Sequence, residues 1–200
     1  MTITQELSSW LAPSTVEVSS PPQLSQPAPS SPPELPLPNP NRQPTIILFL
    51  RHCGCPVAES DFRTLRQAAA QHPQLNFVAV SHSDAPSTAR WLEAVGGAAE
   101  PGSGPGSHPV QVIVDAERRL YARWGSGVAS WGHVLSPSGL MTIVKLGREK
   151  GIWNRPTESG SRWQAGGFWA VDGEGIVRWG RPARRADDFL DVEAAIKAVS

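Results

Sequence analysis

The chain has 200 residues, which is room for one domain with a substantial hydrophobic core, or for one domain and a tail. Its 18 Lys and Arg balance its 18 Asp and Glu, so the formal net charge is zero. A chain without a net field has no general attraction for phosphates or anionic lipid, which argues against nucleic-acid and membrane partners. The sequence also holds no apolar run of about 18 residues that would span a bilayer.

The first residues and the cysteine content both indicate an intracellular protein. The amino-terminal residues lack the basic start and apolar core of a signal peptide, and no Arg-rich amphipathic stretch occurs there. The 2 cysteines, Cys53 and Cys55, are too few for a secreted disulfide framework. We therefore expect a cytoplasmic location, in which both thiols stay available for chemistry.

Two segments precede the first predicted strand. Residues 1–12 are compatible with a short amphipathic helix that either docks on the domain or frays, because about ten residues are too few for a helix that is stable alone in water. Residues 13–44 hold more than half of the 20 prolines. Such a composition cannot continue a helix or fill a central strand, so we expect a disordered or polyproline-type tail or linker there.

The folded domain is predicted over residues 45–200, and its first half alternates strands with helices. Residues 45–50 form a continuous apolar, β-branched run, which is typical of a strand buried on both faces. A helix ending near His72 follows the cysteines, because apolar residues recur on one face: Ala58, Phe62, Leu65 and Ala69. Residues 76–81 form a second strand. The next helix has Pro86 in its first turn and faces inward with Trp91, Leu92 and Val95.

The second half begins with a loop rich in Gly, Pro and Ser over residues 96–109. Residues 110–114 form a third strand, and Asp115 opens a turn into the segment 120–124. Ser136 and Pro137 have the residue types of a helix cap and of a first helical residue, so a helix is expected from there to about residue 146.

A hairpin and a last helix complete the predicted domain. Residues 168–171 and 176–179 flank a turn at 172–175. Asp188 leads the last helix, whose inward face carries Phe189, Val192, Ile196 and Val199. Strands separated by helices pair in parallel, and the late hairpin adds antiparallel strands. We therefore expect an α/β fold with a thioredoxin-like mixed sheet flanked by helices on both faces.

Cys55 is the candidate nucleophile. It lies where a buried strand ends and a helix begins, and Pro56 follows it at a first helical position, so Cys55 is the expected N-cap. A sulfur there faces unpaired N–H groups and the positive end of the helix dipole, which favour the thiolate. Arg51 and His52 would add positive charge, unless Arg51 only solvates the strand end. The alternative is a buried, inert cysteine.

Cys53 has two competing interpretations. The Cys-x-Cys spacing allows a small, strained and easily reduced disulfide, in which Cys53 resolves Cys55. Equally, Cys53 is the last residue of the strand region and points into the core, while Cys55 faces solvent. A metal site of His52, Cys53, Cys55 and His82 is a remote alternative, because no second Cys/His pair with suitable spacing occurs.

Aromatic residues bracket one long polar loop in the second half. Seven of the 8 tryptophans lie from residue 91 onward, six of them in the second half, and core packing is expected for most of them. Residues 153–163 begin and end with Trp, and loops of this length are often functional. This loop is a candidate for a pocket wall near the thiol.

The segment Arg51–Pro56, with the sequence Arg-His-Cys-Gly-Cys-Pro, resembles the peroxiredoxin-like branch of the alkyl hydroperoxide reductase and thiol-specific antioxidant superfamily. It looks most like fungal thioredoxin-like proteins that carry Arg-His-x-Gly-Cys-Pro after the first central strand. The likeness continues through residues 153–163 and 164–172 and covers about residues 45–200. It implies a thioredoxin fold and an antioxidant, thiol-based oxidoreductase whose reactive cysteine is Cys55.

The sequence departs from that family at three positions. Many relatives have a second cysteine where this chain has Ala58, and typical peroxiredoxins have Thr or Ser where it has His52. They also keep an Arg before the late strand, whereas this chain has the stretch 164–167, Gln-Ala-Gly-Gly, with Arg162 nearby but out of register. The first departure removes the vicinal redox pair, and the other two remove the usual hydrogen-bond donors to a peroxide.

Two functions are therefore expected as alternatives. In the first, the Cys55 thiolate attacks a peroxide or disulfide, and Cys53 or an external thiol resolves the product, with electrons from thioredoxin or glutathione and with no bound cofactor or metal. In the second, the chain is a non-catalytic thioredoxin-fold module for binding or redox sensing.

Overall fold

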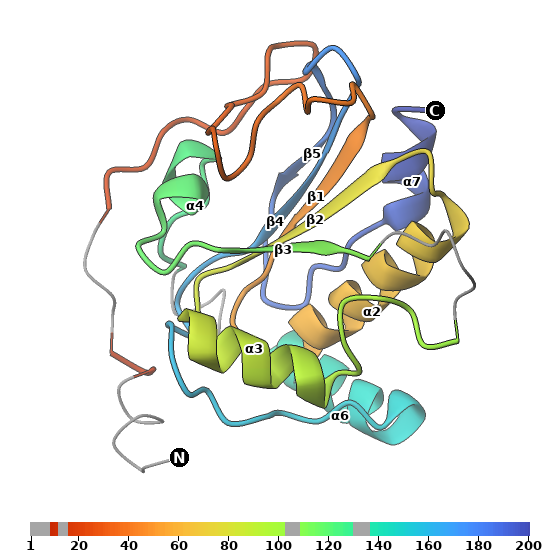
Figure 1. The fold of residues 1–200 in the computed structure, drawn as a ribbon. Helices are drawn as coiled ribbons and strands as arrows, with labels where there is room; N and C mark the ends of the chain where they lie inside the picture. Colours follow the sequence, from red (N-terminus) through yellow and green to blue (C-terminus); the bar gives the residue numbers. More distant parts are fainter. Residues whose placement is uncertain (1–8, 12–15, 103–108, 130–136) are drawn as a thin grey trace.

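A computed structural model gives the fold and describes residues 9–11, 16–102, 109–129 and 137–200. Figure 1 shows a central sheet with helices on both sides. The elements are, in chain order, β1 (Thr45–Phe49), α2 (Pro56–Gln71), β2 (Asn76–Ser81), α3 (Ala85–Ala94), β3 (Gln111–Val114), α4 (Arg119–Arg123), α6 (Pro137–Lys150), β4 (Gly167–Val171), β5 (Val177–Pro182) and α7 (Val192–Lys197).

The sheet has five strands in the order β3-β2-β1-β4-β5. Strands β1, β2 and β3 are parallel, and β4 and β5 join antiparallel beside β1. Strand β1 is therefore central, with Ile47 between Val78 of β2 and Trp169 of β4. The predicted mixed sheet is confirmed.

Alternation along β1 explains its continuous apolar sequence. Ile46 and Leu48 point to one face of the sheet, and Ile47 and Phe49 point to the other. All four are buried because both faces are covered. The cysteine segment leaves the carboxyl end of this strand, so the site starts from the centre of the sheet.

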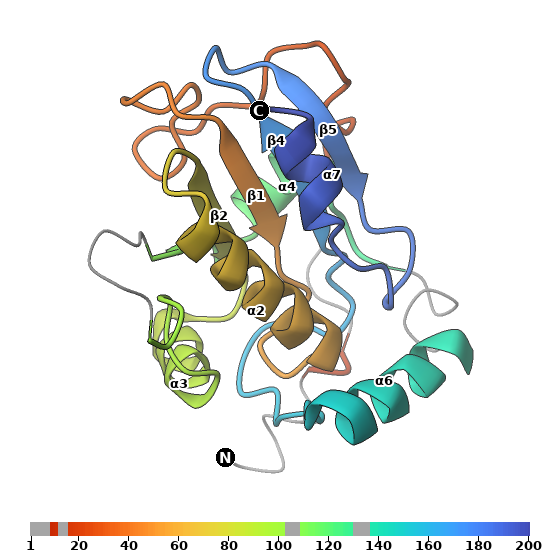
Figure 2. The ribbon, with the colours of Figure 1, turned by 90° about the vertical axis from the view of Figure 1, so that its right-hand side faces the viewer.

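Helices α2, α3, α6 and α7 cover the first face, and Figure 2 shows α2 and α7 lying in front of the sheet. Phe62 and Leu65 of α2 are fully buried against it, and Trp91 of α3 packs its ring edge-on to Phe62 at 5.0 Å. This layer fixes α2 along the sheet and thereby fixes the helix start at Cys55.

The second face is covered by α4 and by the chain that precedes β1. Tyr121 of α4 is fully buried, and its hydroxyl lies 2.6 Å from the Leu50 carbonyl oxygen. Trp124 and Trp169 pack ring against ring at 5.5 Å and are likewise buried. Core packing, expected for most tryptophans, holds for these two.

Residues 16–44 differ from the expected free tail or linker. They run as an arm along α4 and over the end of the sheet (Figure 1). Backbone hydrogen bonds join the arm to the domain, as from Ser19 to Ala122 and from Ala28 to Gly175. Leu35 and Leu37 are buried in the core of the second face. Proline prevents regular structure in the arm, but these two leucines supply apolar surface that anchors it.

The last helix begins later than predicted. Its N-cap is Asp191, whose carboxylate accepts a hydrogen bond from the Ala194 N–H. Asp188 instead pairs with Arg181 and accepts the Arg184 N–H, so it is not free to cap a helix. Phe189 consequently lies before the helix and is 40% exposed rather than inward-facing.

Other predicted elements have smaller differences or lie partly outside the described residues. Helix α6 continues to Lys150, four residues beyond the predicted end, and its expected cap Ser136 is not described. Of the predicted amino-terminal helix, only residues 9–11 are described, and they form a turn. The hairpin turn at 172–175 is confirmed, with the Asp172 carboxylate accepting two backbone N–H groups of the turn.

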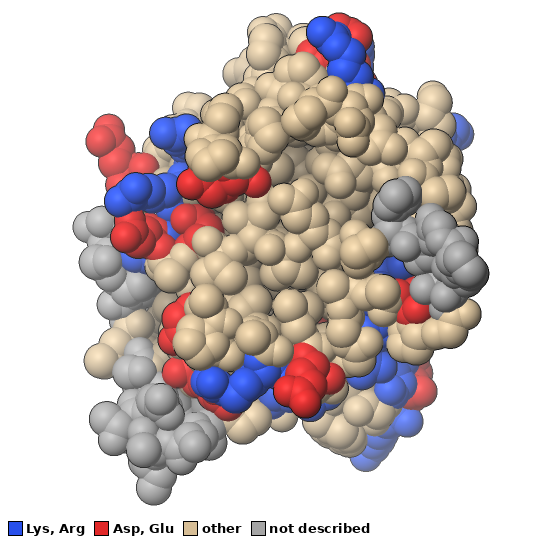
Figure 3. Space-filling model, in the orientation of Figure 1, with Lys and Arg blue, Asp and Glu red and all other residues tan. Residues whose placement is uncertain are grey.

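Charge is distributed without a dominant sign. Figure 3 shows Lys and Arg interspersed with Asp and Glu around the rim of the face in view, and few charged side chains across its centre. This mixture accords with the zero net charge. No helix within the described ranges combines the length and apolar character needed to cross a membrane.

Candidate functional site

Cys55 occupies the predicted position at the start of α2. Its backbone is extended (φ −83°, ψ 125°), it is the N-cap residue, and Pro56 stands in the first helical turn. Its carbonyl oxygen accepts the N–H of Glu59 at 3.0 Å, which is the first hydrogen bond of the helix. The sulfur makes no capping hydrogen bond, and the residue is 3% exposed. The expectation that Cys55 faces solvent when Cys53 points into the core is therefore wrong, because the Cys55 thiol is buried at the positive end of a helix.

Arg51 is the charged partner of Cys55. Its Nη1 lies 3.5 Å from Cys55 Sγ, and its Nη2 donates to the carbonyl oxygen of Arg162 at 2.8 Å. From the sequence, Arg51 could equally have been a solvated residue at the strand end. Its place four residues before the cysteine, where β1 ends, was the available signal. What the sequence does not show is the carbonyl that aims the guanidinium.

His52 does not supply the expected positive charge. Its ring is buried, and burial together with the nearby Arg51 and Arg162 holds its pKa well below the usual value, so it is neutral at pH 7. Its Nδ1 accepts the Gly54 N–H at 3.2 Å and lies 3.3 Å from the Thr157 hydroxyl. His52 therefore shapes the turn between the two cysteines, and the charge beside Cys55 comes from Arg51.

Cys53 has different surroundings from Cys55. Its Sγ lies 3.5 Å from Ser81 Oγ at the end of β2, and burial raises the pKa of its thiol. It lines a hollow of about 150 Å³, whose other walls come from α3 and the 153–163 loop: Ser87, Arg90, Trp91, Ala94, Arg155, Pro156 and Glu158. Both cysteines are free thiols, and each sulfur has its own hydrogen-bonding neighbour.

The 153–163 loop lies against the cysteine segment, as expected for a pocket wall, and the hollow it borders is at Cys53. The Arg155 N–H donates to the Gly54 carbonyl at 3.1 Å. A Cβ at Gly54 would come within 2.5 Å of the Arg155 carbonyl oxygen, so only glycine allows this approach. Further along, the Ser161 N–H donates to His82 Nε2 at 3.1 Å.

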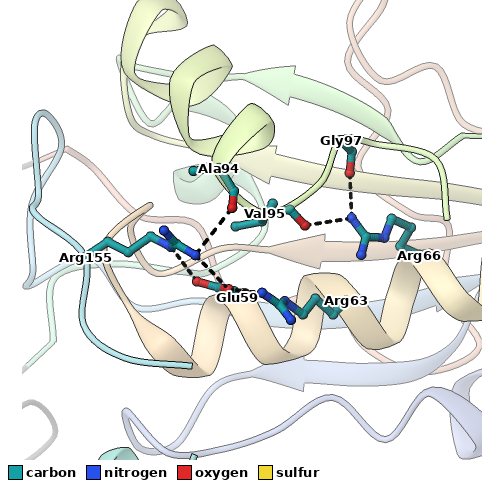
Figure 4. A network of polar contacts seen from close by, with 7 residues as sticks. All are labelled: Glu59, Arg63, Arg66, Ala94, Val95, Gly97 and Arg155. Carbon is teal, nitrogen blue, oxygen red and sulfur yellow. Dashed lines mark hydrogen bonds and ion pairs between the residues drawn. The ribbon is translucent and has the colours of Figure 1, made fainter. Parts of the chain in front are cut away.

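A buried carboxylate ties this loop to α2 (Figure 4). Glu59, in the first turn of α2, is 1% exposed and binds Arg155 Nε at 2.8 Å and the Arg63 side chain. Arg66, further along α2, donates to the carbonyl oxygens that end α3, at Val95 and Gly97, both at 2.9 Å. These pairs hold α2, α3 and the loop in one arrangement around the two cysteines.

The metal alternative finds no geometric support. Within the part of the chain that the structure describes, no group of three or more His, Cys, Asp or Glu side chains is arranged to hold a metal ion. His82 is fully buried, and burial lowers its pKa to about 4. Its Nε2 meets the Ser161 backbone rather than either thiol.

Comparison with known proteins identifies the fold. No protein-family model matches the sequence, and no curated protein matches it. A thiol peroxidase from Chromobacterium violaceum superposes with a TM-score of 0.57 at 15% identity, over 92% of this chain and 89% of the other. A peroxiredoxin-like protein from Aquifex aeolicus gives 0.56 at 15%, over 92% and 90%. A cysteine-to-serine mutant of peroxiredoxin 6 of Arenicola marina gives 0.59 at 11%, over 88% and 71%.

The class that these matches define is the thioredoxin-like α/β fold. The chain shares this fold with the thiol peroxidase and the peroxiredoxin-like protein over 92% of its length. At identities of 11–15% the likeness establishes the fold, which confirms the predicted fold class. The chemistry has to be argued from the site itself.

Proposed function

We propose that this protein is a thiol-based oxidoreductase in which the Cys55 thiolate attacks a peroxide or a disulfide. The observation that carries the proposal is the Arg51 guanidinium 3.5 Å from Cys55 Sγ, at the start of a helix. A thiolate is the reactive form of cysteine, and both the guanidinium and the helix N-terminus stabilise negative charge on that sulfur.

The first step has the same nucleophile for either substrate. With a peroxide, a bond forms between sulfur and oxygen as the O–O bond breaks; the sulfur is oxidised to a sulfenic acid, and the departing oxygen takes a proton and leaves as water or an alcohol. With a disulfide, a new S–S bond forms and the other half leaves as a thiolate. The Arg51 guanidinium also remains available to the departing anion.

The second step needs another thiol. A thiol attacks the sulfenic acid, releasing water and forming a disulfide, and a dithiol or two monothiols then reduce it. Cys53 is near in sequence, but its raised pKa makes it a poor nucleophile at pH 7. An external thiol such as thioredoxin or glutathione is therefore the resolving partner we favour, and it would suit the cytoplasmic location that we propose.

Alkylation by iodoacetamide tests the nucleophile directly. We expect Cys55, measured in Cys53→Ser, to react at pH 6 faster than Cys53, measured in Cys55→Ser. Arg51→Met should slow the alkylation of Cys55 by about tenfold or more, since a hydrogen bond to a charged group contributes about 1.5–3 kcal/mol. Arg42→Met is the matched control, because Arg42 pairs with Glu174 on the exposed hairpin.

Peroxide consumption in the presence of a thiol reductant then tests turnover. Loss of consumption in Cys55→Ser, with activity kept in Cys53→Ser, supports an external resolving thiol. Equal loss in both variants supports an internal disulfide. If Cys55 is alkylated no faster than Cys53 and Arg51→Met does not change its rate, the proposed enzymatic function is refuted.

The second candidate is a non-catalytic module for binding or redox sensing. The burial of both cysteines favours it, because a peroxide reaches Cys55 only after some local opening. Stoichiometric oxidation of Cys55 without multiple turnovers would select this function over the first.

A further inference from the structure

We propose that Ser9 and Trp10 are positioning residues that hold Arg51 against Cys55, acting through the backbone of Arg162 and Trp163. The inference rests on the proposed function, because it concerns the guanidinium beside the proposed nucleophile. It adds to that function an amino-terminal turn more than 40 residues before Cys55 in the sequence.

The first link is the way Arg51 is held. Its two hydrogen bonds run from Nη1 to the sulfur and from Nη2 to the carbonyl oxygen of Arg162. Its Nε is buried without a partner among the described residues. A long side chain loses considerable rotamer entropy when it is held in one conformation. The Arg162 carbonyl is thus the one oxygen in the described structure that aims this guanidinium at Cys55.

The second link fixes that carbonyl in place. The Arg162 N–H donates to the Ser9 carbonyl at 3.1 Å, and Arg162 Nε donates to Ser9 Oγ, also at 3.1 Å. Trp163 Nε1 donates to the Trp10 carbonyl at 2.8 Å. Ser9 is buried although it lies in the amino-terminal region. The turn therefore holds both Arg162 and Trp163, the two residues joined by the peptide bond whose carbonyl oxygen binds Arg51.

Contacts of the Trp10 ring add to these hydrogen bonds. The Trp10 and Trp163 rings pack edge to face at 6.5 Å, and the Arg162 guanidinium lies 4.9 Å from the centre of the Trp10 ring. Trp163 is itself buried, and its carbonyl accepts the Ala129 N–H at 2.6 Å. Trp10 thus packs on a residue that is anchored to the domain, and it is 42% exposed, so substituting it leaves the core intact.

The experiment uses the full chain with Cys53→Ser, so that Cys55 is the only thiol. The readout is the rate of Cys55 alkylation by iodoacetamide at pH 6. We expect Trp10→Ala to slow the reaction about two- to fivefold, the range that a cation–π contact at an exposed site stabilises. Trp10→Phe keeps a ring and should restore most of the rate. Leu11→Ala is the matched control at an exposed neighbour and should change nothing.

A double-mutant cycle separates positioning from general loosening. If Trp10 acts through Arg51, then Trp10→Ala should have no further effect once Arg51→Met is present. Equal slowing in both backgrounds would overturn the inference, as would a faster reaction in Trp10→Ala, which would mean that the turn shields the thiol.

The cycle also distinguishes failure of this inference from failure of the proposed function. Slowing by Arg51→Met without any effect of Trp10→Ala leaves the proposed function in place and overturns the positioning role. If the cycle shows coupling between Trp10 and Arg51 but the protein consumes no peroxide, the positioning role is upheld and the proposed peroxidase activity is refuted.

Discussion

Asp61 allows a quantitative test of how burial controls charge in this fold. It lies in the second turn of α2, six residues after Cys55, and its Oδ1 accepts the Leu190 N–H at 3.1 Å. Burial raises its pKa to about 8, and the neighbouring Asp188 adds to the rise, while the Leu190 N–H and Lys150 oppose it. The carboxyl therefore keeps its proton in the folded protein at pH 7.

The sign of the pH dependence follows from that pKa. Between about pH 4 and pH 8 the unfolded chain has released the Asp61 proton and the folded chain has not, so folding stability falls as the pH rises through this window. The full difference corresponds to about 6 kcal/mol at 1.36 kcal/mol per pKa unit. Because local relaxation and water entry reduce such penalties, we expect Asp61→Asn to stabilise the protein by about 3 kcal/mol at pH 9. At pH 3.5 we expect no difference.

Urea unfolding at pH 3.5, 7 and 9 measures this effect. At a slope of about 2 kcal/mol per molar urea, the midpoint of Asp61→Asn should rise by about 1.5 M at pH 9. Asp172→Asn is the control with the opposite sign, because hydrogen bonds from Ile176 and Arg178 outweigh desolvation and lower the pKa of Asp172. A variant Asp61→Asn that shifts the midpoint equally at all three pH values would refute the reasoning.

Two further predictions concern the frame around the cysteines. Glu59→Gln should lower the free energy of unfolding, measured by urea denaturation, by about 1–3 kcal/mol, because Arg155 and Arg63 lose a buried anion. Arg63→Gln should lower it less, since Arg155 still neutralises Glu59. An equal loss in the two variants would contradict the pairing. His82, whose pKa burial lowers to about 4, should remain neutral at pH 5.5 in an NMR titration. Stability should then fall from pH 6.5 to 4, since the unfolded chain takes up that proton first; a titration near 6.5 would contradict its burial.

The accuracy of the sequence predictions depends on how local the determining interactions are. Strand β2 matches its predicted bounds, 76–81, because a short apolar run with β-branched residues leaves few alternatives. The prediction that Asp188 leads the last helix was wrong, because the residue type suits a helix cap but its carboxylate pairs with Arg181 on β5. A residue type shows what a side chain is able to do, and its nearest partner in space decides what it does.

The arm over residues 16–44 was missed for a related reason. Its proline content correctly excludes a helix or a central strand, and residues 16–44 form neither. Lack of regular structure does not imply lack of packing, however, because Leu35 and Leu37 reach the core of the second face. Two buried leucines in a proline-rich segment look from the sequence like the exposed apolar residues that any tail contains.

In the candidate site, too, the features set by sequence neighbours could be predicted and those set by distant contacts could not. The placement of Cys55 at a helix start depends on neighbours such as Pro56, and it could be inferred from a few residues. The charge beside it could not, because Arg51 is aimed by a carbonyl 111 positions away, which is in turn held by Ser9, 153 positions before it. His52, adjacent to Arg51, is neutral for the same kind of reason, since distant elements bury it. Local sequence thus locates the proposed nucleophile, while the reactivity that we propose for it depends on contacts that only the folded chain brings together. Substitutions at Ser9 or Arg162 should therefore change the alkylation rate of Cys55 more than most substitutions nearer to it in the sequence.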